Sequence, residues 1–139
     1  MAVATASKVT PFLMFTGRAA EALEFYTGLF DDAEVMALNR YGADQPEREG
    51  TVMHATFRIG SQVLMAIDSP PVHEFDFTPS LSLYVQCESE EEIDRLAAAL
   101  GEGGHVMMPL SEEYPFAQKY AWLSDRFGVS WQLSYGLLT

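Results

Sequence analysis

Length, composition and charge set broad limits on what this chain can do. Its 139 residues are 48% hydrophobic and 20% charged, which is typical of one globular domain with a real hydrophobic interior. A net charge of −12 with only eight Lys and Arg residues argues against nucleic-acid binding, because that affinity depends on basic side chains that neutralise phosphates. The acidic excess serves solubility or attracts a cationic ligand.

The sequence also indicates a cytoplasmic protein without a membrane attachment. Its apolar runs are too short to span a bilayer, and the residues before Lys8 do not have the pattern of a secretory signal. A lone cysteine, Cys87, excludes a disulfide within the chain, which fits a reducing compartment.

The first part of the chain alternates between strand and helix patterns. Apolar residues at helical spacing predict a helix over residues 18–30. We predict strands over residues 9–15, 35–41, 51–59 and 62–68. The polar, turn-rich residues 42–50 should form an exposed loop.

A proline-rich linker, residues 69–79, precedes a second run of the same pattern. Ser89 and Glu92 form a capping box that predicts a helix over residues 89–100. We predict strands over residues 80–86, 105–110, 119–124 and 129–135. Residues 1–139 therefore form a single domain of two βαβββ modules, the first from about 8 to 68 and the second from about 80 to 136.

Alternation within the strands divides their side chains between two faces. The apolar face should pack under a helix, and the other face should line a hollow or meet water. Because Tyr84 and His54 lie among small residues on this second face, we favour an enclosed cavity. The second face carries Val52, His54, Thr56, Arg58, Ser80, Ser82, Tyr84, Gln86, Ser130, Gln132 and Ser134.

A loop with several aromatic residues, residues 112–122, leads into one of these strands. One interpretation makes it a lid, with Phe116, Tyr120 and Trp122 against a ligand. The other interpretation makes it part of the core or of a dimer interface, and we favour that one slightly.

Short motifs along the chain match one known superfamily. They are Val9-Thr-Pro-Phe-Leu-Met-Phe15, Ala22-Leu-Glu-Phe-Tyr26, Val52-Met-His-Ala55, Gly60-Ser-Gln-Val-Leu-Met65 and Asp125-Arg-Phe-Gly-Val-Ser-Trp-Gln132. With them the chain resembles the vicinal oxygen chelate superfamily of glyoxalases, extradiol dioxygenases, and fosfomycin- and bleomycin-resistance proteins. It is most similar to the PhnB-like branch, described as 3-demethylubiquinone methyltransferase-like proteins. The resemblance implies an α+β fold, with the two modules forming a half-open barrel within a homodimer.

The same resemblance implies where a divalent metal would bind, on four inward positions of the strands. In this sequence they fall near Pro11, in the strand around residues 64–67, near Ser80 and on Gln132. Pro has no side-chain ligand atom, Ser is a weak ligand, and residues 64–67 offer no carboxylate. His54, His73 and His105 have no short metal-ligand spacing. We therefore expect no metal and no other cofactor.

The methyltransferase label has no support in the residues. A nucleotide-like cofactor usually requires a Gly-rich loop between a strand and a helix, whereas Gly101-Glu-Gly-Gly104 follows a helix and ends it. We do not expect methyltransferase activity.

Two main hypotheses for function remain. In the first, the chain is a metal-independent binding protein that holds a small, partly aromatic or polar ligand in the cavity between the modules. In the second, it is an enzyme with lyase, transferase or isomerase chemistry, in which His54 acts as acid and base. A third possibility is a structural or regulatory dimer without a ligand. The ligand-binding residues that we predict are Arg58, Ser80, Ser82, Tyr84, Trp122 and Gln132.

Overall fold

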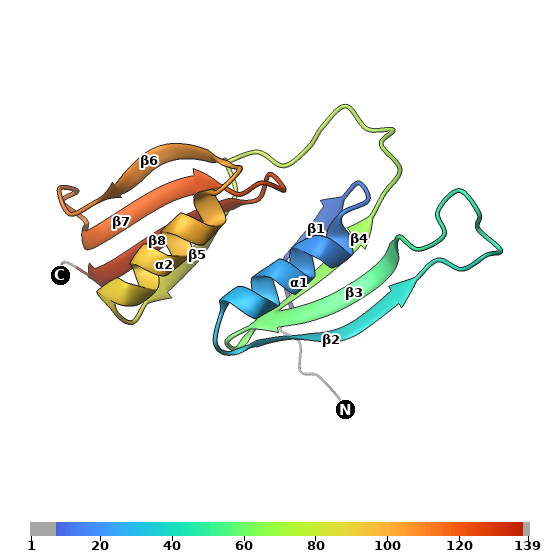
Figure 1. Cartoon of the computed structure of the whole chain (residues 1–139), viewed down its shortest axis with the longest axis horizontal. Coiled ribbons are helices and arrows are strands. Elements are labelled where there is room, and N and C mark those ends of the chain that lie inside the picture. Colours follow the sequence, from blue (N-terminus) through green and yellow to red (C-terminus); the bar gives the residue numbers. More distant parts are fainter. Residues whose placement is uncertain (1–7, 138–139) are drawn as a thin grey trace. The chain divides into compact units, whose positions relative to one another are not determined.

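The computed structural model describes residues 8–137, which contain two helices and eight strands in two βαβββ modules (Figure 1). Module 1 consists of β1 (Phe12–Phe15), α1 (Ala19–Leu29), β2 (Ala33–Arg40), β3 (Val52–Ile59) and β4 (Gln62–Asp68). Module 2 consists of β5 (Ser82–Cys87), α2 (Glu90–Gly101), β6 (His105–Ser111), β7 (Ala117–Ser124) and β8 (Ser130–Leu137). The chain divides into two compact units between His73 and Glu74, within the proline-rich segment. The predicted α+β class and the duplicated order of elements are confirmed, and the half-open barrel stays a prediction.

Both modules have the same sheet topology. Sheet A has the strand order β1-β4-β3-β2, and sheet B has the matching order β5-β8-β7-β6. In each sheet the first strand pairs in parallel with the last strand of its module, and the other neighbours pair in antiparallel fashion. Neither sheet closes on itself, because its first and second strands in chain order form the two edges.

Each helix covers one face of its own sheet, as Figure 1 shows for both modules. In module 1, Tyr26 of α1 is fully buried and stacks on Phe57 of β3 with the ring centroids 6.4 Å apart. In module 2, Ile93, Leu96 and Leu100 of α2 are fully buried on the side of α2 that faces the sheet. This burial removes apolar surface from water and is the main stabilising term of each module.

Two predicted strands begin two or three residues later than expected. β1 begins at Phe12 and not at Val9, since Pro11 has no N–H for a ladder and contributes only its carbonyl, which accepts from the Met65 N–H. β5 begins at Ser82 because Ser80 lies in a turn, where its hydroxyl hydrogen-bonds the Thr78 hydroxyl at 2.7 Å. Ser80 is therefore outside the strand face to which the alternation assigned it.

A bulge in β3 changes which of its residues face the helix. Asn39 pairs with His54 and Arg40 pairs with Val52, so Met53 is an extra residue. Val52 is fully buried and Met53 is 47% exposed. The prediction that Val52 shares a face with His54, and that Met53 packs under the helix, is wrong because simple alternation does not continue through a bulge.

A buried carboxylate holds the start of α1 in module 1. Asp68 ends β4, and its Oδ1 accepts hydrogen bonds from the N–H groups of Gly17 at 2.8 Å and Ala19 at 3.0 Å. Its Oδ2 accepts from the Val52 N–H at 2.9 Å, next to the bulge. The N-cap residue Arg18 makes no capping bond with its own side chain. Asp68 thus satisfies helix N–H groups that would otherwise lack a partner.

A second buried carboxylate holds the hairpin between β7 and β8. Asp125 Oδ1 accepts from the N–H groups of Phe127 at 2.8 Å and Val129 at 3.1 Å. Its Oδ2 accepts from the indole N–H of Trp131 at 2.8 Å. Gly128, with a φ of 96°, supplies the left-handed conformation that the turn requires. Asp125 therefore connects the turn to the largest buried side chain of module 2.

No helix within residues 8–137 has both the length and the apolar character that a membrane-spanning helix requires.

Candidate functional site

The face of sheet B that points away from α2 carries polar and aromatic side chains without a charge. Alternation in β8 buries Trp131 and Leu133 toward α2 and places Ser130, Gln132 and Ser134 on the other side. The strand pairing brings further residues of the same kind beside them. We call this set the open face of sheet B, and it consists of Ser82, Tyr84, Gln86, Tyr120, Trp122, Ser130, Gln132 and Ser134.

Three strands meet in a hydrogen-bonded group at one end of the open face. The Trp122 indole N–H on β7 donates to the Ser130 hydroxyl oxygen on β8 at 2.9 Å. That oxygen lies 2.7 Å from the hydroxyl oxygen of Ser82 on β5. Ser82 and Ser130 are direct partners in the parallel pairing, so the sheet register brings the two hydroxyls together.

A second polar contact joins the neighbouring positions. The Tyr120 hydroxyl donates to the side-chain oxygen of Gln132 at 2.6 Å, and Tyr84 is the register partner of Gln132 on β5. Burial raises the pKa of the Tyr120 phenol, and the nearby phenols of Tyr84 and Tyr114 raise it further. Tyr120 therefore keeps its proton at neutral pH and orients the Gln132 amide by a single hydrogen bond.

Aromatic rings pack beside Gln132. Phe116 and Tyr120 meet edge to face with centroids 4.7 Å apart, and Tyr114 stacks on Phe116 at 5.6 Å. The Tyr114 hydroxyl donates to the Pro109 carbonyl, which fixes the ring on β6. Tyr120 is buried but Phe116 is 46% exposed, so the loop both packs on itself and offers an aromatic surface. Its predicted role as a lid stays a prediction.

The structure brings together four of the predicted ligand-binding residues on one sheet of module 2, and the others lie on other elements. Ser82, Tyr84, Trp122 and Gln132 share the open face of sheet B. His54 and Arg58 lie on β3 in sheet A, and Ser80 lies in the turn before β5.

The two predicted residues of sheet A have different surroundings. Arg58 forms ion pairs with Asp32 at 2.8 Å and with Glu34 at 3.0 Å. These hydrogen bonds, with that to Asp32 the stronger, raise the pKa of Arg58. His54 is half-buried with its ring 6.3 Å from that of Phe12. Arg58 is thus engaged by carboxylates, and His54 has an aromatic neighbour.

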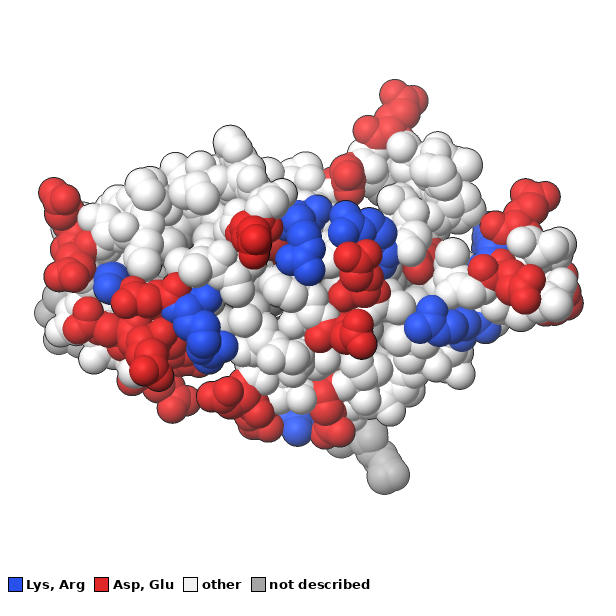
Figure 2. Space-filling model, viewed as in Figure 1, with Lys and Arg blue, Asp and Glu red and all other residues white. Residues whose placement is uncertain are grey.

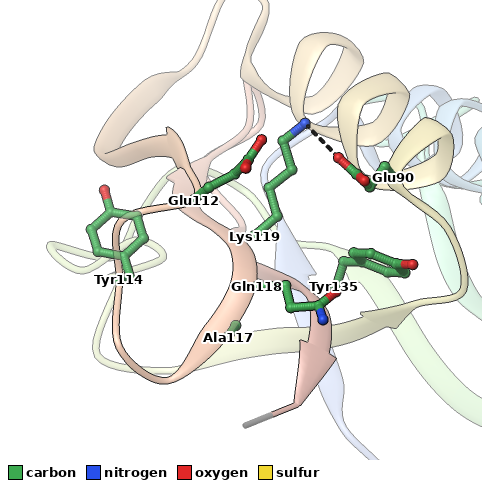
Figure 3. Close-up of a pocket in the computed structure, with 7 residues that line it drawn as sticks. All are labelled: Glu90, Glu112, Tyr114, Ala117, Gln118, Lys119 and Tyr135. Carbon is green, nitrogen blue, oxygen red and sulfur yellow. Dashed lines mark ion pairs between the residues drawn. The ribbon is translucent and has the colours of Figure 1, made fainter.

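A hollow of about 380 Å³ lies on the helix side of sheet B and was not predicted (Figure 3). Its central feature is Lys119, whose ammonium group pairs with Asp94 at 2.7 Å and with Glu90 at 3.6 Å. Figure 2 shows acidic side chains gathered over α2 with basic ones among them. The sequence signal that could have predicted this hollow is a Lys in an alternating strand, combined with an acidic helix in the same module. The lining residues are Glu90, Glu112, Tyr114, Ala117, Gln118, Lys119 and Tyr135.

The donor set of the open face does not fit a divalent metal ion. Gln132 offers a metal ion one ligand atom, its side-chain oxygen, and one of the two lone pairs of this oxygen accepts the Tyr120 hydrogen bond. Within residues 8–137, no three or more His, Cys, Asp or Glu side chains gather in a way that could hold a metal. The neighbouring oxygens of the open face belong to neutral hydroxyl groups, which are weak ligands for such ions.

Comparisons with known proteins agree with the fold. A family model described as 3-demethylubiquinone-9 3-methyltransferase matches residues 7–134. The PhnB protein from Bacillus cereus is 52% identical over 94% of this chain and 100% of its own, with a TM-score of 0.89. Protein PA1353 from Pseudomonas aeruginosa is 32% identical over 94% of this chain and 98% of its own, with a TM-score of 0.80. A search of curated proteins gave no significant match.

More distant structures share the fold alone. A glyoxylase/bleomycin resistance protein/dioxygenase domain from Frankia is 17% identical over 95% of this chain and 93% of its own, with a TM-score of 0.64. The fosfomycin resistance protein FosX from Listeria monocytogenes is 14% identical over 97% of both chains, with a TM-score of 0.61. The predicted resemblance to the vicinal oxygen chelate superfamily is confirmed at the level of fold. The chain belongs to the PhnB-like family whose model carries the label 3-demethylubiquinone-9 3-methyltransferase.

Proposed function

We propose that this protein binds a small molecule without a metal and that the ligand lies on the open face of sheet B. The observation that carries the proposal is the pair of hydrogen-bonded groups, Trp122 with Ser130 and Ser82, and Tyr120 with Gln132. Polar networks of this kind fix the positions of their side chains, and such pre-organisation is what a binding site needs.

The position of the glycines after α2 favours binding over methyl transfer. Gly101 ends α2 and Gly103 follows it with a φ of 76°, so the glycines terminate a helix and do not open one. A dinucleotide-like cofactor needs the opposite arrangement, in which N–H groups at a helix start receive the phosphates. The methyltransferase label therefore describes the family, and the glycines after α2 do not form the phosphate-binding loop of such a cofactor.

We also propose that the protein acts as a homodimer. Sheet A leaves large apolar side chains exposed, Phe12 by 53% and Met53 by 47%, and its edge strand β2 exposes Met36 by 44%. Apolar surface and open strand edges of this kind are commonly covered by a second copy of the chain.

Native mass spectrometry with elemental analysis, on protein purified without added metal, tests the proposal. We expect a dimer without stoichiometric metal that retains or accepts a small organic mass. The Gln132→Leu variant should lose that mass, whereas Gln62→Leu, on the exposed start of β4, should keep it. Stoichiometric Zn, Ni, Fe or Mn that disappears in Gln132→Leu would overturn the proposal and restore a metal-dependent function.

A further inference from the structure

The directions of the hydrogen bonds around Ser130 leave the Ser82 hydroxyl free to donate its hydrogen to a ligand. An indole N–H can only donate, so Ser130 accepts from Trp122. Ser130 is 1% exposed, so its own hydroxyl hydrogen needs a partner inside the protein, and the Ser82 oxygen at 2.7 Å is that partner. Ser82 is only half-buried, and its own hydrogen remains for a group outside the sheet.

Gln132 leaves donors of the same kind. Its oxygen accepts from Tyr120, so its amide nitrogen carries two N–H groups. No other side-chain hydrogen bond of Gln132 occurs among the residues that the structure describes. The amide therefore presents N–H donors next to the Tyr84 ring, its register neighbour on β5.

A third hydroxyl lies further along β8. Ser134 is fully buried, and its oxygen has no hydrogen-bond partner within the described part of the chain. Buried hydroxyls without a partner are uncommon because they lose their bonds to water and gain nothing in return. Ser134 alternates with Ser130 and Gln132, but its side chain has no exposed surface, so it offers a ligand no donor in this structure.

The open face offers no carboxylate that would neutralise a cationic ligand. All of its members are Ser, Tyr, Trp or Gln, Lys119 and Asp94 pair on the helix side, and His105 on the edge strand β6 is the register partner of Ser124. Exposed rings of Tyr84 (54%) and Phe116 (46%) provide flat apolar surfaces. A cation bound on this face would lose part of its hydration shell, and no carboxylate of the face would compensate for that loss.

We propose that the ligand is a neutral, planar aromatic molecule with two or more acceptor oxygens, bound by Ser82 and Gln132 and stacked on the exposed rings. This inference rests on the proposed function and decides against the alternative of a cationic ligand. Strand positions two residues apart are about 7 Å from each other, so the acceptor oxygens must be spread over a bicyclic ring system or its substituents. The acidic surface then serves solubility.

Three bicyclic probes of similar size test the inference on the full chain by two-dimensional amide NMR. The neutral probe is 7-methoxycoumarin, called coumarin below, whose carbonyl and methoxy oxygens are acceptors on different rings. N-methylquinolinium is a permanent cation, and naphthalene has no acceptor. We expect coumarin to shift the side-chain amide signals of Gln132 and the backbone amides of Ser82 and Tyr84. Its affinity should exceed that of N-methylquinolinium by about tenfold or more, as the desolvation of an unpaired charge requires.

Two variants separate hydrogen bonding from stacking. Ser82→Ala and Gln132→Leu should each weaken coumarin about fivefold, the usual effect of one lost hydrogen bond, and change naphthalene by less than about twofold. Gln62→Leu is the control and should change neither. The amide spectrum of each variant shows directly whether it is folded.

The outcomes distinguish failure of the proposed ligand class from failure of the proposed binding function. If N-methylquinolinium binds as tightly as coumarin, or if the variants weaken naphthalene as much as coumarin, the inference about ligand class is wrong and the binding function stands. If none of the three probes shifts the signals of the open face, the proposed function itself is overturned, and the ligand class with it.

Discussion

The two modules share one topology but present different surfaces on the sheet face away from the helix. In sheet A the positions flanking His54 and Thr56 are taken by apolar side chains, Phe12, Met65 and Ile67 among them. In sheet B the corresponding face carries serines, a glutamine and aromatic residues joined by hydrogen bonds. Because both sheets keep the same strand order, this face varies without a change of fold, and a binding site can develop on one module alone.

The modules agree in how they fix their backbone. Within residues 8–137, a buried Asp in each module accepts three N–H hydrogen bonds, Asp68 in module 1 and Asp125 in module 2. Asp68 receives only backbone donors and joins a helix start to a bulge. Asp125 receives two backbone donors and the Trp131 indole, so it joins a turn to the core. The two carboxylates therefore stabilise different local structures by the same means, the acceptance of N–H hydrogen bonds.

Loss of Asp125 should have the largest effect on stability. Asp125→Ala removes the acceptor of three bonds, two of them from the buried Val129 N–H and Trp131 indole. The two buried N–H groups would then have no acceptor, and the charged acceptor itself would be lost. Together these changes should lower the free energy of unfolding by about 3–5 kcal/mol. Urea denaturation followed by Trp fluorescence measures the change.

The exposed Glu113 provides a matched control for Asp125. Glu113→Ala removes an acid of the same module and should change the free energy of unfolding by less than about 0.5 kcal/mol. A loss below about 1 kcal/mol in Asp125→Ala would contradict the role assigned to this carboxylate.

Loss of Asp68 should be somewhat less damaging. Asp68→Ala leaves the N–H groups of Gly17, Ala19 and Val52 without their acceptor, but Gly17 is exposed and can turn to water. We expect a decrease of about 2–4 kcal/mol in the free energy of unfolding. Hydrogen exchange should locate the loss at the start of α1 and at the bulge in β3. Equal loss of protection in both modules would contradict the view that each module fixes its own backbone, because it would show that the two modules unfold as one cooperative unit.

Local patterns in the sequence account for the fold better than for the site. All ten elements were predicted, and β4 has its predicted bounds, because alternation and helical spacing are local signals. The bulge at Met53 was missed, since it depends on pairing with Asn39 and Arg40 on another strand. Alternation also grouped Ser82, Tyr84 and Gln132 correctly on one face. The contact between Tyr120 and Gln132 could not be predicted, because the strand register that creates it is not a local property.

Removal of the Tyr120 hydroxyl should have a moderate effect that is confined to the open face. Tyr120→Phe keeps the packing of the ring against Phe116 but frees the Gln132 amide to rotate. We expect coumarin affinity to fall about three- to fivefold and the free energy of unfolding to fall by about 1 kcal/mol. NMR titration and urea denaturation measure the two effects. Unchanged affinity would show that Gln132 does not need this orientation.

The pH dependence of wild-type binding checks the same contact. Burial raises the pKa of Tyr120 above its ordinary value of 10.0, so its hydroxyl remains a donor throughout the neutral range. Coumarin affinity should therefore stay constant between about pH 6 and pH 9 and fall only above about pH 10, where the phenol ionises. A decrease centred near pH 6.5 would instead implicate a histidine.

Replacement of His54 should have the smallest effect on binding and distinguishes the two hypotheses for function. His54 lies on sheet A with Phe12 as its aromatic neighbour, whereas the proposed ligand contacts are on sheet B. His54→Ala should therefore change coumarin affinity by less than about twofold, which the same NMR titration measures. A loss of fivefold or more would show that sheet A contributes to binding and would end the contrast between the modules. A substrate whose turnover disappears in His54→Ala while its binding persists would support the enzyme hypothesis. Loss of an acid–base group lowers turnover and leaves affinity unchanged.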